Sequence, residues 1–375
     1  MFYIRADGNT KIGMGHVMRC LSVAEATAKI DCLHPPIFIL ADETCRSLIE
    51  ERGFQVIVLH TDYCDMMGEL PLLEAIFQEK PTIKNVGNQN KNIVLVDSYQ
   101  ADSTYYFALS KMVKTVCFED MGQAYPVDLL INYNLYAPRL AAQYIAAETE
   151  SQAINKYPRK VLLGANYMPL RKAFQTPSNY SVAEQVRNVT ITTGGSDPYF
   201  ATATLVEALM RDPMITEQEI TLHLISGPFN EFAEELKRKY QNYEKKSANA
   251  TTLQIQIHEN IKDMRSLLYD SDIVITATGS TIYEVSALGV PMIVFYFAEN
   301  QRQGAKELER LTNIVNAGNI AIEPDRTAER IRDTLRRCIQ NKKYRERLYR
   351  QEKELIDAKG AQRIAEQIKE LLLSQ

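Results

Sequence analysis

The sequence predicts an α/β protein built from two Rossmann-like domains. Short apolar runs alternate with longer amphipathic segments along most of the 375 residues, as parallel strands alternate with the helices that cover them. The alternation stops at a polar stretch, residues 175–184, and then begins again. A chain of this length commonly holds two domains. We therefore expect an N-terminal domain over residues 1–180 and a C-terminal domain over residues 181–375, facing each other across a cleft.

The first half contains seven short runs that are rich in Val, Ile and Leu, and each predicts a buried strand. We expect these strands at 2–5, 36–41, 55–59, 93–97, 113–118, 128–132 and 160–163. Amphipathic segments between them predict helices at 16–29, 43–52, 69–79 and 102–111. The polar segment 84–91 is expected to be a loop.

The second half repeats the same alternation. We expect strands at 188–193, 220–226, 253–257, 272–276, 291–296 and 319–322, and helices at 199–211, 229–241, 261–269, 280–288 and 301–313. The polar segment 242–252 predicts another loop. After Pro324 the chain mixes both charges and is helical to its end. The sequence leaves open whether this tail packs on the first domain.

The most informative motif is the turn after the first strand. Gly13 and Gly15 separate that strand from an amphipathic segment, and a strand, a glycine-rich turn and a helix N-terminus together form a pocket for an anion or a phosphorylated ligand. His16 stands at the mouth of this turn, and an imidazole can accept a proton near neutral pH. Asp7 and Arg19 are further candidates. The alternative is a tight turn with a capping histidine.

A second glycine-rich turn follows the expected strand 188–193. Gly194 and Gly195 allow backbone N–H groups to approach a ligand closely. The following polar residues, Ser196 and Asp197, have an alternative interpretation as caps of the next helix.

A third turn, Gly279-Ser280-Thr281, stands at an expected helix N-terminus, where N–H groups and hydroxyls suit a diphosphate. Glu284 follows one helical turn later, where a carboxylate can accept hydrogen bonds from ribose hydroxyls. Asn300 opens a later helix, and its alternative role is a helix cap. All three turns lie at carboxyl ends of strands, so we expect them at one crevice between the domains.

Composition excludes several classes of protein. The net charge is −4, so no overall positive field attracts nucleic acid. No apolar run reaches the length of a membrane span, and the chain starts directly with an expected strand, so we expect a cytoplasmic protein without membrane insertion. The six cysteines and five histidines have neither disulfide-framework nor metal-ligand spacing, so we expect reduced thiols and no metal.

These motifs resemble a known family. Arg5-Ala6-Asp7-Gly8 with Ile12-Gly13-Met14-Gly15-His16 is similar to the amino-terminal signature of UDP-2,4-diacetamido-2,4,6-trideoxy-β-L-altropyranose hydrolases. These enzymes act in pseudaminic acid biosynthesis, and spore-coat polysaccharide proteins are relatives. Over residues 1–320 the further matches are 94–99, 130–134, 169–171, 193–197, 279–281 with Glu284, and Asn300-Gln301. Thr278 stands where the family often has glycine, which leaves the shape of the phosphate turn open.

The resemblance implies a glycosyltransferase B-like (GT-B) architecture and a nucleotide-sugar hydrolase. Water attacks the anomeric carbon of a UDP-linked 2,4-diacetamido-2,4,6-trideoxy sugar with inversion, which releases UDP and a free sugar for a bacterial surface glycan. His16 matches the catalytic base, and Tyr99 and Asn300 match positions near the sugar. The second domain holds UDP. Its expected contacts are Glu284 on the ribose and Ser280, Thr281, Gly194 and Gly195 near the diphosphate.

The remaining positions expected to bind substrate share the motifs quoted above. They are Asp7, Gly13, Gly15, Arg19, Asp97, Asn132, Asn134, Arg171, Ser196, Gly279 and Gln301. The resemblance implies no cofactor and no metal. The expected partner is the UDP-sugar alone, with no nucleic acid, and the expected state is a monomer or weak dimer.

Other functions stay open at this point. A glycosyltransferase of the same fold would present a basic or apolar acceptor face, and a hydrolysing UDP-sugar 2-epimerase would carry more carboxylates near the sugar. A Rossmann oxidoreductase would need a compact G-x-G-x-x-G, and the first turn, G-M-G-H-V-M-R, lacks the third glycine. A non-catalytic UDP-sugar-binding protein would bind without turnover.

Overall fold

The computed structural model describes residues 1–9, 12–30, 34–78, 92–144, 158–241 and 252–374. The expected loop at 84–91, and all but the last residue of the one at 242–252, lie outside the described residues. The chain separates into two compact units. Unit 1 is Met1–Lys172 together with Ala358–Gln375, and unit 2 is Ala173–Asp357.

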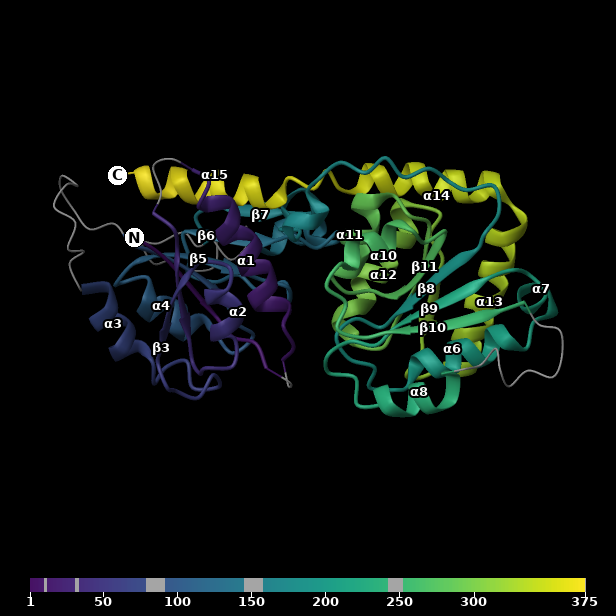
Figure 1. Cartoon of the computed structure of the whole chain (residues 1–375). Coiled ribbons are helices and arrows are strands. Elements are labelled where there is room, and N and C mark those ends of the chain that lie inside the picture. The colour runs from purple at the N-terminus through teal and green to yellow at the C-terminus, as the bar shows by residue number, and fades with distance from the viewer. Residues whose placement is uncertain (10–11, 31–33, 79–91, 145–157, 242–251, 375) are drawn as a thin grey trace. The chain divides into compact units, whose positions relative to one another are not determined.

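Unit 1 is built on a parallel sheet with the strand order β3-β2-β1-β4-β5-β6-β7 among the described residues (Figure 1). Its strands are β1 (Phe2–Ala6), β2 (Ile37–Leu40), β3 (Gln55–Val58), β4 (Ile93–Asp97), β5 (Lys114–Phe118), β6 (Leu129–Asn132) and β7 (Val161–Leu163). Its helices are α1 (Gly15–Thr27), α2 (Arg46–Glu50), α3 (Leu70–Gln78), α4 (Ser103–Leu109) and α15 (Gly360–Leu373). All seven expected strands are confirmed.

Unit 2 repeats this winding in a parallel sheet with the order β10-β9-β8-β11-β12-β13. Its strands are β8 (Asn188–Thr192), β9 (Thr221–Ile225), β10 (Gln254–His258), β11 (Ile273–Ala277), β12 (Met292–Tyr296) and β13 (Asn316–Asn319). Its helices are α6 (Ala201–Met210), α7 (Pro213–Thr216), α8 (Ala233–Tyr240), α10 (Met264–Tyr269), α11 (Thr281–Leu288), α12 (Glu299–Leu311), α13 (Pro324–Gln340) and α14 (Lys342–Leu355). The prediction of two Rossmann-like domains is confirmed.

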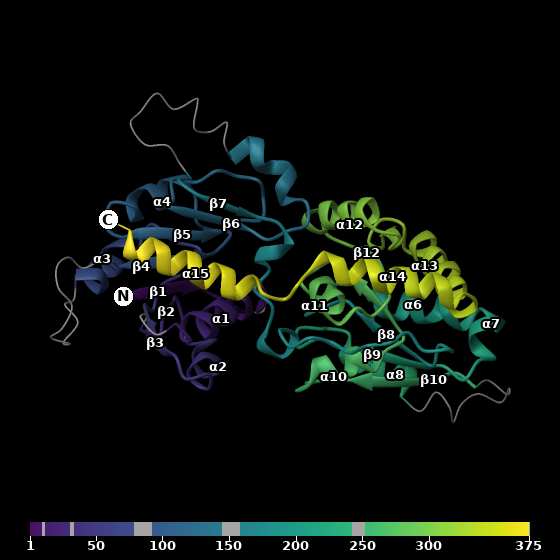
Figure 2. The same ribbon diagram turned by 90° about the horizontal axis from the view of Figure 1, so that it is seen from above.

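The continuous apolar runs in the sequence correspond to the central strands of the two sheets. Every residue of β1, β4 and β11 is buried, since helices cover both faces of each sheet. In unit 2, α13 packs beside α6 (Figure 2). In each unit the first and fourth strands of the winding are neighbours, β1 with β4 and β8 with β11. At this position the connections diverge and leave a crevice at the carboxyl ends of the strands.

Strand β13 differs from its prediction. The sequence placed a strand on 319–322, where Ile320 and Ile322 are apolar. The structure pairs the polar segment Asn316–Asn319 with β12 instead, and the register shifts between Val294 and Tyr296. β13 lies at the edge of the sheet, where hydrogen bonding decides the pairing and apolar periodicity is a weak guide.

The unit boundary also differs from the prediction. We expected the division at 180/181 and the tail in the second domain, whereas unit 2 begins at Ala173 and the last segment belongs to unit 1. Helix α15 lies beside α1 in both views (Figures 1 and 2). It buries Ile364 and Ile368, and Lys114 Nζ donates to the carbonyl oxygen of Leu371 at 2.7 Å. The amphipathic pattern of the tail predicts a buried face, but it does not say which unit covers it.

We predict that Gly360→Ala destabilises the docking of α15. A Cβ at this position would lie 2.1 Å from the carbonyl oxygen of Met168. Overpacking of this kind lowers the free energy of unfolding by about 1–3 kcal/mol, which urea unfolding measures. Gly304→Ala in α12 is the matched control, because a Cβ there meets nothing within 4 Å and should leave stability unchanged or raise it. Equal stability of the two variants would contradict this contact.

Candidate active site

The crevice of unit 1 brings together the first and fourth strands of its sheet. Ala6 at the end of β1 pairs with Asp97 at the end of β4, and α1 begins nearby at Gly15. His16 is the second residue of α1 and is buried, with 5% of its surface exposed. Two polar side chains that the chain separates by 81 residues therefore meet at the site where this fold binds ligands.

Asp97 orients the His16 ring. His16 Nδ1 lies 2.6 Å from Asp97 Oδ1. An ionised carboxylate only accepts hydrogen bonds, so Nδ1 carries the hydrogen and Nε2 is the basic nitrogen of the neutral ring. An imidazole fixed in this tautomer can accept a proton from water at Nε2.

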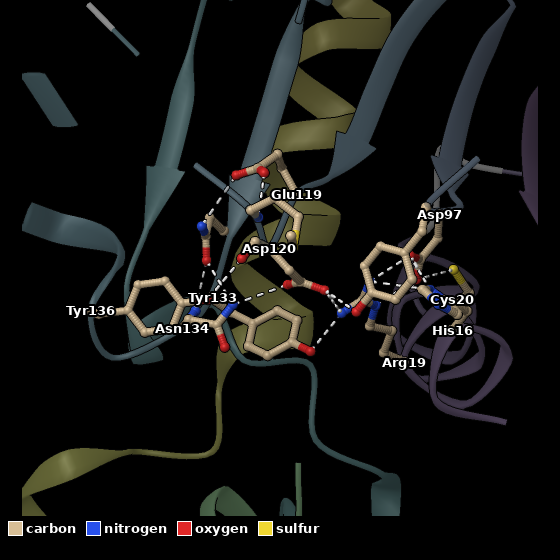
Figure 3. Close-up of polar contacts among 12 residues, drawn as sticks. His16, Arg19, Cys20, Asp97, Glu119, Asp120, Tyr133, Asn134 and Tyr136 are labelled. Carbon is tan, nitrogen blue, oxygen red and sulfur yellow. Dashed lines mark hydrogen bonds and ion pairs between the residues drawn. The ribbon is translucent and has the colours of Figure 1, made fainter. Parts of the chain in front are cut away.

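Arg19 holds the same carboxylate from the next turn of α1. Its Nε donates to Asp97 Oδ2 and its Nη2 to Asp97 Oδ1, both at 2.5 Å. Nη1 extends the network to Asp120 Oδ2 at 2.9 Å and to the Tyr133 hydroxyl at 2.6 Å. Figure 3 shows Arg19 between the His16–Asp97 pair and the residues around Asp120. Its guanidinium carbon also lies 4.9 Å from the centre of the Phe118 ring, a cation–π contact.

The charge of Arg19 keeps the carboxylate of Asp97 ionised. Burial alone would raise the pKa of Asp97, but the charge of Arg19 and the hydrogen bonds from Arg19 and His16 more than offset it and hold the pKa of this carboxyl well below its usual range.

Tyr99 completes the cluster from the loop after β4. Its ring is perpendicular to that of His16, with 4.6 Å between the ring centres. Its hydroxyl donates to Asp120 Oδ2 at 3.1 Å. His16 and Tyr99 line a small pocket together with Asp97, Ile12 and Tyr63. The structure thus gathers two of the three residues that the resemblance assigned to catalysis.

Asp7, another expected substrate contact, lines the same pocket but is engaged by the protein. Its carboxylate pairs with the buried Arg5, and its Oδ1 accepts a hydrogen bond from the N–H of Ala41 at 2.8 Å. Arg5 in turn pairs with the buried Glu69 at 2.7 Å. These contacts fix the turn after β1.

The glycine turn itself is closed by backbone hydrogen bonding. Gly13 adopts a left-handed φ of +75° and donates to the carbonyl oxygen of Asn9 at 2.8 Å, so this position favours glycine. Gly15 is exposed at the start of α1, and a Cβ there would meet nothing within 4 Å.

The side chains of Asn132 and Asn134 are hydrogen-bonded to other protein side chains around the site. Asn132 is fully buried and donates to Tyr144 and to Glu119. Asn134 Nδ2 donates to Asp120 Oδ1 at 3.0 Å. Arg171 is half-buried at the end of unit 1.

In unit 2 the second glycine turn follows β8. Gly194 has a φ of +93°, and Gly195 is exposed. The turn packs tightly on the next one, since a Cβ on Gly227 would lie 2.3 Å from the carbonyl oxygen of Gly194. Ser196 is half-buried, and Asp197 accepts hydrogen bonds from the N–H groups of Ala201 and Thr202 at the start of α6. The alternative role of Asp197 as a helix cap is therefore confirmed.

The third turn lies on the neighbouring strand. Thr192 of β8 pairs with Thr276 of β11, so the turns after these strands are adjacent. Gly279 and Ser280 are exposed at the start of α11, and Glu284 is buried in its first turn. This helix N-terminus offers N–H groups to an anion.

Three further expected contacts in unit 2 also lie at helix starts. Thr281 is the half-buried first residue of α11, and Asn300 is exposed in the first turn of α12. Gln301 Oε1 accepts a hydrogen bond from the N–H of Phe297 at 3.1 Å, which ties α12 to β12.

Asp120 is a residue of this cluster that sequence reasoning missed. It follows β5 directly, together with Glu119, and the turn continues to Gly122. The signal was present, because an acidic pair stands at the carboxyl end of a predicted parallel strand. Asp120 lies 101 residues from Arg19 in the chain, so the sequence did not predict the hydrogen bond between them.

The described residues contain neither a metal-ligand cluster nor a membrane-spanning helix. No group of three or more His, Cys, Asp and Glu side chains is arranged to hold a metal ion there. Within the same residues, every helix falls short of the length and apolarity that a membrane crossing requires.

Comparison with known proteins gives a family match for the second half of the chain. Residues 189–368 match the glycosyltransferase family 28 C-terminal domain. The chain is also 25% identical over 376 residues to the spore coat polysaccharide biosynthesis protein SpsG of Bacillus subtilis, with 98% of this chain and 97% of that protein covered. The expected relation to spore-coat polysaccharide proteins is therefore confirmed as distant homology.

An uncharacterized protein of Methanocaldococcus jannaschii is 26% identical over 306 residues. The match covers 80% of this chain and 56% of that protein, so the chain spans little more than half the length of this relative. Two solved structures have the same fold. The first is MurG of Acinetobacter baumannii, with a TM-score of 0.64 and 13% identity over 98% of this chain and 99% of that chain. The second is S. aureus MnaA with UDP, with a TM-score of 0.61 and 14% identity over 99% of this chain and 96% of that chain. The fold is GT-B, as predicted.

We predict that Asp97→Asn destabilises the protein in a pH-dependent way. A carboxyl with a depressed pKa in the folded state stabilises the fold above its ordinary pKa, and this contribution is lost as the pH falls toward the depressed value. The variant should lose about 3–5 kcal/mol of unfolding free energy at pH 7. The difference should shrink below about pH 4.

Urea unfolding at pH 7 and pH 3 measures this difference. Asp333→Asn is the control, because that carboxylate is 61% exposed on α13. It should change stability little at either pH. An equal effect of Asp97→Asn at both pH values would contradict an ionised Asp97.

Proposed function

We propose that this protein hydrolyses a UDP-linked 2,4-diacetamido-2,4,6-trideoxy sugar at the anomeric C–O bond. The products are UDP and the free sugar with inverted configuration, which serves pseudaminic acid-type nonulosonate biosynthesis. The observation that carries the proposal is the pairing of His16 Nδ1 with Asp97 beside a pocket, because it leaves Nε2 as a base. The family resemblance of the motifs and the distant homology to SpsG support the choice of substrate.

The reaction needs one activated water. In the proposed step, His16 Nε2 accepts a proton from water while the water oxygen bonds to the anomeric carbon. The C–O bond to the diphosphate breaks, and its electron pair leaves with UDP. General base catalysis of this kind contributes about 10²–10⁴-fold to the rate. Asp97 stabilises the imidazolium that forms, because its carboxylate accepts the hydrogen bond from Nδ1.

Unit 2 would bind the nucleotide. Residues 189–368, which match the family 28 domain, contain both glycine turns of unit 2, and the similar fold of MnaA was solved with UDP. The exposed N-terminus of α11 at Gly279 and Ser280 would take up the charge that develops on the diphosphate. Glu284 would accept hydrogen bonds from the ribose. Water then replaces the acceptor that a glycosyltransferase would use.

An inverting glycosyltransferase is the second candidate, favoured by the family 28 match. The two functions differ in their products. Incubation with the UDP-sugar alone, followed by NMR, gives UDP and free sugar only if the protein is a hydrolase. A transferase releases UDP at a useful rate only when an acceptor is added.

We predict that His16→Ala lowers the turnover number at least about 10²-fold. Its affinity for UDP, measured by calorimetry, should be nearly unchanged, because unit 2 is expected to bind the nucleotide. His60→Asn is the matched control in unit 1, since His60 is exposed and has a positive φ that asparagine tolerates. Turnover retained by His16→Ala would remove His16 from the role of base.

We predict the opposite pattern for Glu284→Ala. Loss of a carboxylate that binds ribose hydroxyls should raise KM about 10-fold or more with little change in the turnover number. Glu309→Ala, an exposed position on α12, should leave both constants unchanged. An unaltered KM in Glu284→Ala would exclude the ribose assignment.

A further inference from the structure

The hydrogen bond that Tyr99 makes determines what its oxygen can do in the pocket. A phenol has a single hydrogen, and Tyr99 donates it to Asp120 Oδ2 at 3.1 Å. Partial burial and the charge of Asp120 raise the pKa of Tyr99, so this hydrogen stays on the phenol. The Tyr99 oxygen can therefore only accept a hydrogen bond from a molecule in the pocket.

Asp120 is held in this arrangement by several hydrogen bonds. Its Oδ2 also accepts a hydrogen bond from Arg19 Nη1 at 2.9 Å, and its Oδ1 accepts from Asn134 Nδ2 at 3.0 Å. Its backbone carbonyl accepts from the hydroxyl of Tyr136 at 2.8 Å. Four donors thus hold Asp120, and those from Arg19 and Asn134 can be followed in Figure 3. An ionised carboxylate has no hydrogen to offer to Tyr99.

His16 provides a second acceptor at the same pocket. Its Nδ1 is hydrogen-bonded to Asp97, so Nε2 is the acceptor, and its ring contacts that of Tyr99 at 4.6 Å between centres. Both side chains line the same pocket. Water has two hydrogens to donate to such a pair, whereas an alcohol has only one.

We propose that Asp120 is a positioning residue that makes Tyr99 an acceptor, so that His16 and Tyr99 together bind both hydrogens of the nucleophile and select water over an alcohol. This inference rests on the proposed function. One hydrogen of the water goes to His16 Nε2 as the water oxygen bonds to the anomeric carbon. The other stays on that oxygen, donates to Tyr99, and becomes the hydroxyl hydrogen of the product. UDP leaves with the electron pair of the broken bond.

The experiment uses methanol as a competing nucleophile. The UDP-sugar is turned over at a fixed methanol concentration, and NMR gives the ratio of methyl glycoside to free sugar. Tyr99→Phe removes the second acceptor, so the ratio should rise about 3–10-fold as hydrolysis slows. Asp120→Ala should raise it similarly, because the phenol hydrogen is then free to turn into the pocket.

A double variant tests whether Asp120 acts through Tyr99. In the Tyr99→Phe background, Asp120→Ala should change the product ratio less than about twofold. A merely structural loss would slow both reactions equally and leave the ratio unmoved. Asp128→Ala is the matched structural control, since this buried carboxylate accepts the N–H of Thr115 at 2.8 Å outside the site. If Asp120→Ala does not fold, Asp120→Glu takes its place in the single and double variants, because it moves the carboxylate by one methylene.

Each outcome bears on the inference. Turnover by the unaltered protein with an unchanged ratio in Tyr99→Phe would overturn it and leave the proposed function standing. An effect of Asp120→Ala that persists in the Tyr99→Phe background would show that Asp120 acts through Arg19, and this also overturns it. Absence of any hydrolysis by the unaltered protein would overturn the proposed function and this inference together.

Discussion

The candidate site depends on one buried cation. Arg19 lies between Asp97 and Asp120 and donates to both carboxylates. Without its charge, the buried carboxylate of Asp97 and the partly buried carboxylate of Asp120 would be uncompensated, and breaking a buried ion pair commonly costs about 3–5 kcal/mol. Burial opposes the charge of Arg19, yet Asp120 and Asp97 keep its pKa well above the usual value. The guanidinium therefore keeps its positive charge at neutral pH.

This cation also fixes the relation between separate parts of unit 1. From α1, the Arg19 side chain donates hydrogen bonds to Asp97 at the end of β4, to Asp120 after β5 and to Tyr133 after β6. The His16 ring is oriented by the carboxylate that Arg19 holds, and the Tyr99 hydroxyl by the other. The orientations of the His16 ring and of the Tyr99 hydroxyl are thus both linked to Arg19. Such preorganisation is what a site needs to align a single water.

The fold and the turns were largely accessible to sequence reasoning. Central strands such as β4 and β11 are buried on both faces, so they read as continuous apolar runs, and their ends could be placed closely. The edge strand β13 was misplaced, since its pairing comes from backbone hydrogen bonds and its residues are polar. The glycine turns were found because left-handed positions such as Gly13 and Gly194 require a particular residue type.

The sequence by itself determined two Rossmann windings and the turns at their strand ends, and it predicted His16 as a candidate base at the first of these turns, because periodicity and glycine content are local properties. Only the tertiary structure decided that Asp97 orients His16, that Arg19 serves carboxylates of the protein and that Asp120 belongs to the site. It also decided that α15 packs on unit 1. These contacts join residues about 80 to 260 positions apart. Their partners are chosen by strand order and burial, which no local pattern encodes.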